Sequence, residues 1–330
     1  MTNPTKKQHF VPRFYLKNFA NEQGFVHVLD IAKKRLGTPR PYAGVGYAPY
    51  FYAAKTGVPD EVSQHIEAWL QRHEDVIAAE MPRIIKVLLS QEQINDDDRY
   101  VLSVLMSLFW LRSPGMRAQL AKMEEDMLKQ IMRFYPKERV DRLVDEAGEP
   151  LSEETRQRMV EMIDKGTYRL EFSNAQHLRF MTEHLGYGKP GFANMFHGMK
   201  WTVHIARGNE RFITTDSPVV EWCPPPQTFY GPSFLERNKY FALTPEIFLE
   251  LTYPRGSKKV KRNTMFADDD DKVRTFNMLL AAHSQGYAYS GSKEALETML
   301  AGRLQPGPLE LAYYNRYEKP WNEYYAKQGQ

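Results

Sequence analysis

The stretch KKQHFVPRFYLKNF, residues 6–19, is unusually apolar for a segment so close to the start of a chain. It carries four aromatic side chains, a leucine and a valine, whereas chain termini are usually polar and poorly ordered. A segment of this composition is expected to dock into the body of the protein rather than remain in water. His9 and Arg13 would be carried inward with it, so we expect this stretch to supply part of a polar pocket.

The composition of the 330 residues is that of a globular protein, with 42% hydrophobic and 26% charged residues. The net charge of +3 is too small to indicate, by itself, a protein that binds nucleic acid or a membrane surface. The single cysteine, Cys223, excludes an internal disulfide framework and fits a reducing cytosol. The chain begins without the apolar region of a signal peptide, and its longest apolar run, residues 100–111, is too short to span a bilayer. We therefore expect a soluble, cytoplasmic protein with no membrane partner.

The sequence changes character near residue 190, which predicts two kinds of structure within one α+β domain. Before that point, apolar residues recur at helical spacing, so about 60–186 is predicted to form a mostly helical block. Pro82 is expected to kink or split the first helix of this block, because it removes a hydrogen-bond donor and clashes with the preceding turn. After residue 190 the pattern favours an antiparallel β-sheet with further helices packed against the helical block.

Within the sheet-forming part, residues 200–206 and 211–215 flank an Arg-Gly-Asn turn and are predicted to pair as a β-hairpin. Before the helical block, the aromatic arm is followed by one predicted strand at 25–31. A long segment rich in glycine, proline and tyrosine then covers 33–59, where only a short extended piece at 50–52 is expected. The sequence shows no internal repeat and no clear linker, so residues 1–330 are predicted to form a single α+β domain.

Common sequence signatures of metal and nucleotide chemistry are absent from the chain. There is no cysteine pair for zinc, no His-Glu-x-x-His motif and no glycine-rich phosphate loop of either common type. The Gly-x-Ser-x-Gly motif of serine hydrolases is also missing. Any chemistry must therefore come from residues that lie far apart in the sequence.

Polar side chains in two apolar settings are the first candidates for such a site. His9 and Arg13 lie within the N-terminal arm, where the alternative is a buried histidine bonded to the backbone and an arginine that extends to solvent. Glu67 and Glu74 lie seven residues apart and therefore share one face of the first long helix. Two carboxylates on such a face could hold a metal ion or act as a base, or they could form a solvated surface.

Two further candidates lie at the ends of predicted elements. Arg112 ends the most apolar helix, where it could complement the helix dipole or point into a pocket and bind phosphate or carboxylate. Residues 214–218, with the sequence TTDSP, place the oxygens of Asp216 and Ser217 at the end of a strand. Catalytic side chains are common there, but Asp216 could instead form an Asx-turn onto its own backbone.

Several of these segments together resemble one bacterial protein family. QHFVPRFYLKNF at 8–19 is similar to the opening signature of the family catalogued as domain of unknown function 4238. FITTDSP at 212–218 is similar to its second signature, in which the usual form has Ser in place of Thr215. The segment Leu243-Thr244-Pro245 is similar to its third, with Ala242 in place of the first proline.

The resemblance extends over about residues 6–290 and includes the spacing of the two helical glutamates and the helix that bears Asn277. It implies that His9, Glu67, Asp216 and Asn277 belong to one recurring pattern and converge on a site. It implies no particular activity, because the family has no settled biochemistry.

Three functions are compatible with these residues. The first is a hydrolase or nuclease that acts on a phosphate-bearing substrate, such as nucleic acid or a nucleotide. The second is a non-catalytic sensor or interaction protein, for example in phage defence, that binds an anion or a peptide in the same pocket. The third is a buried polar network that fixes the docking of the N-terminal arm while the function lies on another surface.

The first function assigns a role to each candidate residue. His9, Glu67 and Asp216 would be catalytic, as general base or as ligands of a divalent metal, for which Glu67 and Asp216 are the expected ligands. The expected substrate-binding side chains are Arg13, Arg112, Ser217 and Asn277. The substrate itself and the oligomeric state are not indicated by the sequence.

Overall fold

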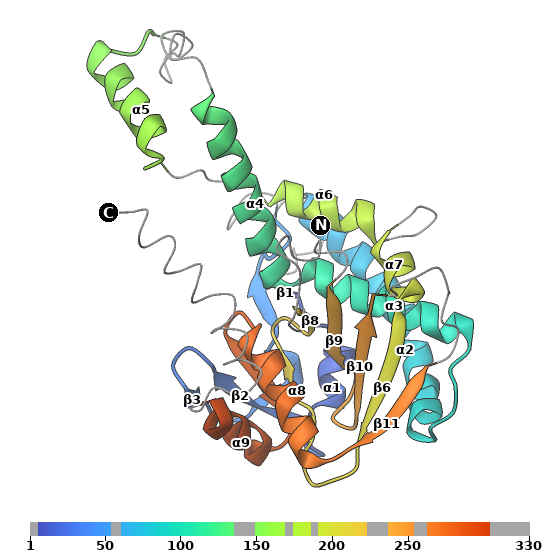
Figure 1. The fold of residues 1–330 in the computed structure, drawn as a ribbon. Helices are drawn as coiled ribbons and strands as arrows, with labels where there is room; N and C mark the ends of the chain where they lie inside the picture. Colours follow the sequence, from blue (N-terminus) through green and yellow to red (C-terminus); the bar gives the residue numbers. More distant parts are fainter. Residues whose placement is uncertain are drawn as a thin grey trace.

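The N-terminal arm is built into the body of the protein. The computed structural model describes residues 6–53, 61–134, 149–168, 174–185, 191–222, 237–253 and 263–303 (Figure 1). Strand β1 (Lys7–His9) pairs antiparallel with β5 (Tyr47–Pro49), and helix α1 (Arg13–Asn18) follows directly. Val11, Tyr15 and Leu16 have no exposed surface, and Phe19 is only 1% exposed. The predicted docking of this segment is therefore confirmed.

Between residues 61 and 185, the described part of the chain is mostly helical, as predicted. Its helices are α2 (Glu61–Leu89), α3 (Asp96–Arg112), α4 (Pro114–Arg133), α5 (Glu153–Lys165) and α6 (Ala175–His184), and α7 (Phe192–Gly198) follows them. Local caps fix their boundaries: the side chain of Asn95 accepts a hydrogen bond from the Asp98 amide, and Ser113 accepts one from the Met116 amide. The short α7 was not predicted from the sequence. In Figure 1, α4 and α5 project away from the rest of the molecule.

Helix α2 continues without interruption through Pro82, so the predicted split of this helix is wrong. The bounds of α2 do not test the alternative prediction, a kink of the helix at Pro82. Pro82 lies on the exposed side of α2, where water can bind the backbone groups that the proline ring leaves without partners.

A five-stranded sheet in the order β11-β6-β10-β9-β8 packs against these helices. The strands are β6 (Lys200–Ala206), β8 (Val219–Trp222), β9 (Asn238–Ala242), β10 (Ile247–Thr252) and β11 (Thr264–Asp268). The pairs are antiparallel except for β11 with β6, so the sheet is mixed rather than purely antiparallel as predicted.

Both faces of this sheet are covered. On one face, Phe248 of β10 stacks on Phe276 of α8 (Asp270–Ala282), with 4.2 Å between the ring centroids. On the other face, Phe241 of β9 contacts Tyr15 of α1 and Phe109 of α3. Figure 1 shows the corresponding layers, with α8 in front of the sheet and α2 and α3 behind it. Coverage of both faces agrees with the burial of successive residues along β6, β9 and β10.

A second sheet joins strands from both ends of the described chain, in the order β3-β2-β12-β7, with β4 also paired to β2. Its strands are β2 (Phe25–Asp30), β3 (Arg35–Leu36), β4 (Arg40–Pro41), β7 (Thr214–Thr215) and β12 (Tyr287–Ser290). The predicted hairpin of 200–206 with 211–215 is therefore wrong, because β7 pairs with β12 while β6 pairs with β10 and β11. The Asn277 side chain binds the carbonyl of Arg211 and the amide of Ile213, which holds this segment on α8.

The segment from residue 33 is more regular than predicted. It contains β3, β4, a 3-10 turn at Tyr42–Gly44 and β5, whereas the expected extended piece at residues 50–52 is a turn in which Tyr50 has a positive φ of 50°. Strands of two or three residues are too short to show an alternating pattern, which is why the sequence did not indicate them. Helix α9 (Lys293–Arg303) ends the described chain.

The architecture is α+β, as the sequence predicted, and one hydrophobic cluster extends from Phe10 to Met299. Among the described residues, none of the helices combines the length and the apolar character that crossing a membrane requires.

Candidate functional site

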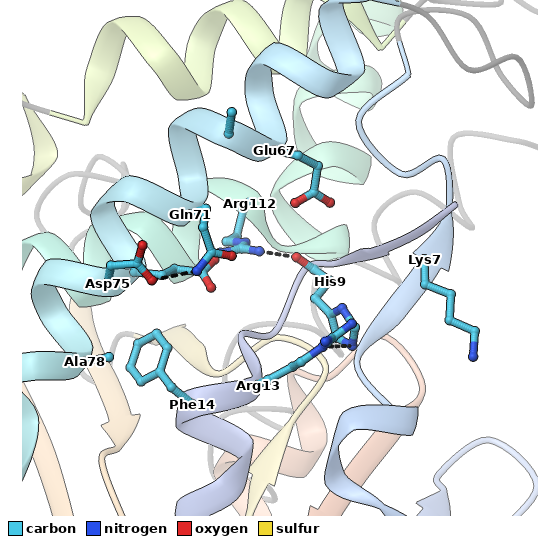
Figure 2. A pocket seen from close by; sticks show the side chains of 11 residues that line it. Lys7, His9, Arg13, Phe14, Glu67, Gln71, Asp75, Ala78 and Arg112 are labelled. Atoms are coloured by element: carbon cyan, nitrogen blue, oxygen red, sulfur yellow. Dashed lines mark hydrogen bonds and ion pairs between the residues drawn. The ribbon is translucent and has the colours of Figure 1, made fainter. Parts of the chain in front are cut away.

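A polar pocket with a volume of about 640 Å³ lies between the N-terminal arm and α2 (Figure 2). The arm contributes Lys7, His9, Arg13 and Phe14, α2 contributes Glu67, Ala68, Gln71, Glu74, Asp75 and Ala78, and α3 contributes Arg112. The α2 residues recur at intervals of three and four, so they form a single face of the helix. Its alanines leave space between the polar side chains.

Arg112 lines the pocket and links the N-terminal arm to α2 through its guanidinium. Its side chain is 1% exposed, and Nη1 lies 2.5 Å from Oε1 of Glu74. Nε donates to the Tyr52 hydroxyl at 2.9 Å and Nη2 donates to the carbonyl of His9, which also accepts from the Tyr52 hydroxyl. Although burial opposes the charged form, Tyr52 and Glu74 raise the pKa of Arg112, so it stays a cation. All three nitrogens are thus bound to protein groups.

Glu67 is the most unusual carboxylate of the pocket. Its Oε1 is buried and has no hydrogen-bond partner among the described residues. Burial raises the pKa of Glu67 to about 7; Arg112 opposes this shift and Glu74 adds to it. Near neutral pH this side chain therefore both accepts and releases a proton readily, and none of the described protein groups competes for the buried oxygen.

His9 is a neutral histidine at physiological pH. Burial, followed by the charge of Arg13, lowers the pKa of His9 to about 4. Its Nε2 lies 3.3 Å from the carbonyl oxygen of Ala43 and 3.5 Å from Nε of Arg13. The first contact needs a proton on Nε2 and the second needs a lone pair there, so only one of them forms at a time. The tautomer of His9 is thus linked to the position of Arg13.

Arg13 and Lys7 are the exposed cations of the pocket. Neither forms an ion pair with a carboxylate within the part of the chain that the structure describes. The Lys7 ammonium lies 5.1 Å from the centroid of the Tyr47 ring, and Nε of Arg13 lies 3.5 Å from Nε2 of His9, at the limit of a hydrogen bond. Both side chains are therefore available to an anion that enters the pocket.

The other predicted site residues do not line this pocket. The carboxylate of Asp216 accepts from the amides of Gln285 at 2.9 Å and Tyr287 at 3.1 Å, and burial raises its pKa to about 6. The neighbouring Ser217 is also buried, and the Asn277 side chain binds the backbone of Arg211 and Ile213. Asp216, Ser217 and Asn277 therefore do not share the lining of this pocket with His9 and Glu67, because their segment pairs with β12 and is bound by α8.

The structure thus brings together His9, Arg13, Glu67 and Arg112 of the predicted set. Sequence reasoning missed a further set of lining residues, namely Lys7, Phe14, Ala68, Gln71, Asp75 and Ala78. Those on α2 could have been found by continuing the spacing of three and four from Glu67.

A metal site is not formed by clustered side chains in the described chain: no group of three or more His, Cys, Asp or Glu residues there is arranged to hold a metal ion. The expected ligands Glu67 and Asp216 have different surroundings, since Glu67 lines the pocket and Asp216 binds backbone amides.

Comparison with protein families gives one match. The family described as "Protein of unknown function (DUF4238)" matches residues 7–294. That range includes the N-terminal arm, the pocket and both sheets. A comparison with curated proteins finds no match. A comparison with solved structures finds none either.

Proposed function

Because the chain belongs to the DUF4238 family, whose description names no activity, we propose its function from the pocket itself: a hydrolase that acts on a phosphate-bearing substrate. The observation that carries the proposal is the Glu67 carboxylate, with a buried, unpartnered oxygen and a pKa of about 7, in one pocket with the cations Arg13 and Lys7. Glu67 can exchange a proton at neutral pH, and the cations can hold the phosphate.

In this mechanism, ionised Glu67 takes a proton from the attacking water as the bond from the water oxygen to phosphorus forms. The bond from phosphorus to the leaving-group oxygen breaks, and that oxygen is released with a proton from Glu67 or from solvent. Arg13 and Lys7 bind the phosphate oxygens and stabilise the negative charge of the transition state. Neutral His9 donates from Nε2 to Ala43 once Arg13 turns to the substrate. Arg112 is a positioning residue, because its guanidinium binds Glu74 and the carbonyl of His9.

Asp216, Ser217 and Asn277 have no part in this proposal because they lie outside the pocket lining. A cytoplasmic location, with nucleotides or nucleic acid as the phosphate-bearing substrate, belongs to the same proposal. Adding magnesium or manganese to the assay measures whether a divalent metal takes part.

The test is a screen for hydrolysis of nucleotides and nucleic acids, with and without magnesium or manganese, on the wild type and on Glu67→Gln. Loss of a general base is expected to lower the rate by about 100-fold or more. The control is Glu80→Gln, on the same helix but outside the pocket lining, where loss of an exposed pair with Arg83 has little effect on stability.

The pH dependence gives an independent readout of the same role. Since the base must be ionised, the wild-type rate should rise with pH through about 7 and level off above it. The inflection should be absent from any residual rate of Glu67→Gln. Equal rates for wild type and Glu67→Gln, with both folded by circular dichroism, would remove the hydrolase proposal.

A second candidate is a non-catalytic sensor of a phosphate-bearing ligand. It is supported by the lining residues that the structure describes, which include the exposed cations Lys7 and Arg13 but no serine, threonine or cysteine that could itself attack a bound ligand. The sensor predicts that wild type and Glu67→Gln both bind the ligand without turnover in the same screen.

A further inference from the structure

The two ends of the pocket differ in chemistry. Figure 2 shows Lys7, His9 and Arg13 toward one end, whereas Asp75, Ala78 and Phe14 lie together at the other. The first end carries cations and suits an anionic group. A ligand that fills the pocket must therefore present a different kind of group to the second end.

The second end is rich in hydrogen-bond acceptors. Nε2 of Gln71 donates one of its two N–H groups to Oδ1 of Asp75 at 2.6 Å. One N–H of this amide remains, whereas Oε1 of Gln71 and Oδ2 of Asp75 can both accept further bonds, so acceptors are in excess. The group that binds here should therefore carry N–H donors.

The same end has an aromatic surface with space beside it. Phe14 is half-buried, and Figure 2 shows its ring next to Ala78 and close to Asp75. The small Ala78 side chain leaves room along the ring. A flat, conjugated group is the kind of ligand that gains most from such a surface, since bases stack on aromatic side chains whatever their identity.

We infer that the ligand is a nucleotide whose base carries an exocyclic amino group, with its phosphate at Lys7 and Arg13 and its base between Phe14 and Asp75. Carboxylate and amide oxygens accept from the amino groups of cytosine and adenine, whereas uracil and hypoxanthine present an oxygen at that position. The volume of about 640 Å³ lies in the range of small-ligand sites and holds a single nucleotide. This inference deepens the proposed function and rests on it for the placement of the phosphate.

The experiment compares ligands that differ only at the exocyclic group. Binding of CMP and UMP, and of AMP and IMP, is measured by titration calorimetry on the wild type, with inorganic phosphate as the probe of the cationic end alone. Each amino nucleotide should bind about 5- to 150-fold tighter than its oxo counterpart. The ratio is the readout, because a general loss of folding would weaken both members of a pair.

Asp75→Asn is the variant that tests the acceptor. It keeps the shape of the side chain and replaces one oxygen by an N–H₂ donor, so the preference for CMP over UMP should fall toward one or reverse. Phe14→Leu should weaken every nucleotide and preserve the ratio. The control is Asp126→Asn on α4, an exposed residue paired with Lys122, which should preserve both affinity and ratio.

The outcomes separate this inference from the proposed function. Equal affinities of the wild type for CMP and UMP and for AMP and IMP would overturn the nucleotide inference, even if Glu67-dependent hydrolysis of other phosphates is found. A preference for the amino nucleotides that Asp75→Asn abolishes would uphold the inference, even if no turnover occurs and the hydrolase proposal fails. Binding of inorganic phosphate but of none of the nucleotides would also overturn it.

Discussion

Arg112 joins both walls of the pocket through one buried guanidinium, and its partners could not be predicted from the sequence. At the end of an apolar helix, its position favours either the helix dipole or a bound anion. In the structure it instead binds Glu74, Tyr52 and the carbonyl of His9, which is 103 residues away in the sequence. Local spacing carries no information about a contact of that separation.

Replacing Arg112 by Met should lower the free energy of unfolding by about 3–5 kcal/mol, because Glu74 and the His9 carbonyl would lose a buried partner. Urea denaturation measures this loss. In the double variant Arg112→Met/Glu74→Gln, part of the loss should be recovered, since the charge of Glu74 is removed together with that of its partner. A change below about 1 kcal/mol in the single variant would contradict the role of Arg112 as the link between the arm and α2.

At the scale of elements, helices were predicted well because their signals are local. The face of α2 that bears Glu67 and Glu74 follows from their spacing alone. Whether that face is exposed to solvent or lines a pocket depends on the N-terminal arm that packs opposite it. The sequence of the helix alone gives no information about that contact. Strand partners were predicted poorly for the same reason: β7 pairs with β12, and Asn277 of α8 binds the segment just before β7, but the turn that precedes β7 indicates neither contact.

A larger side chain at Ala78 tests whether the base of the nucleotide occupies the space beside Phe14. Ala78→Leu should fill the space beside Phe14 and lower the affinity for CMP by about 10- to 100-fold through steric exclusion. Stability should change little, because Ala and Leu have similar helix propensities. Titration calorimetry and thermal denaturation measure the two effects.

Ala79→Leu is the matched control for this substitution, since Ala79 is the next residue, is exposed and does not line the pocket. It should bind CMP as the wild type does. If both leucine variants bind CMP equally well, the base is not held against Phe14.

For the whole molecule, composition and the change in pattern near residue 190 were enough to predict the α+β class. They were not enough to place the N-terminal strands, because β2 pairs with β12, from the other end of the described chain. Strands this far apart in the sequence pair only when the hydrophobic core between them has formed. Tyr15 lies at the centre of that core, where its ring contacts Phe109 of α3 and Phe241 of β9.

Tyr15 also joins the two sheets, because its hydroxyl lies 2.8 Å from Oγ1 of Thr214 in β7 and donates to the carbonyl of Ala242 in β9 at 2.6 Å. Tyr15→Phe should lower the free energy of unfolding by about 1–3 kcal/mol, because these buried oxygens lose a partner, and Tyr15→Ala by about 3–5 kcal/mol. If residues 1–330 form the single domain that the sequence predicts, far-UV circular dichroism and tryptophan fluorescence should report one coincident transition in each variant. Separate transitions would instead show that the arm and the sheets unfold independently, and an unchanged Tyr15→Phe would show that the hydroxyl does not link them.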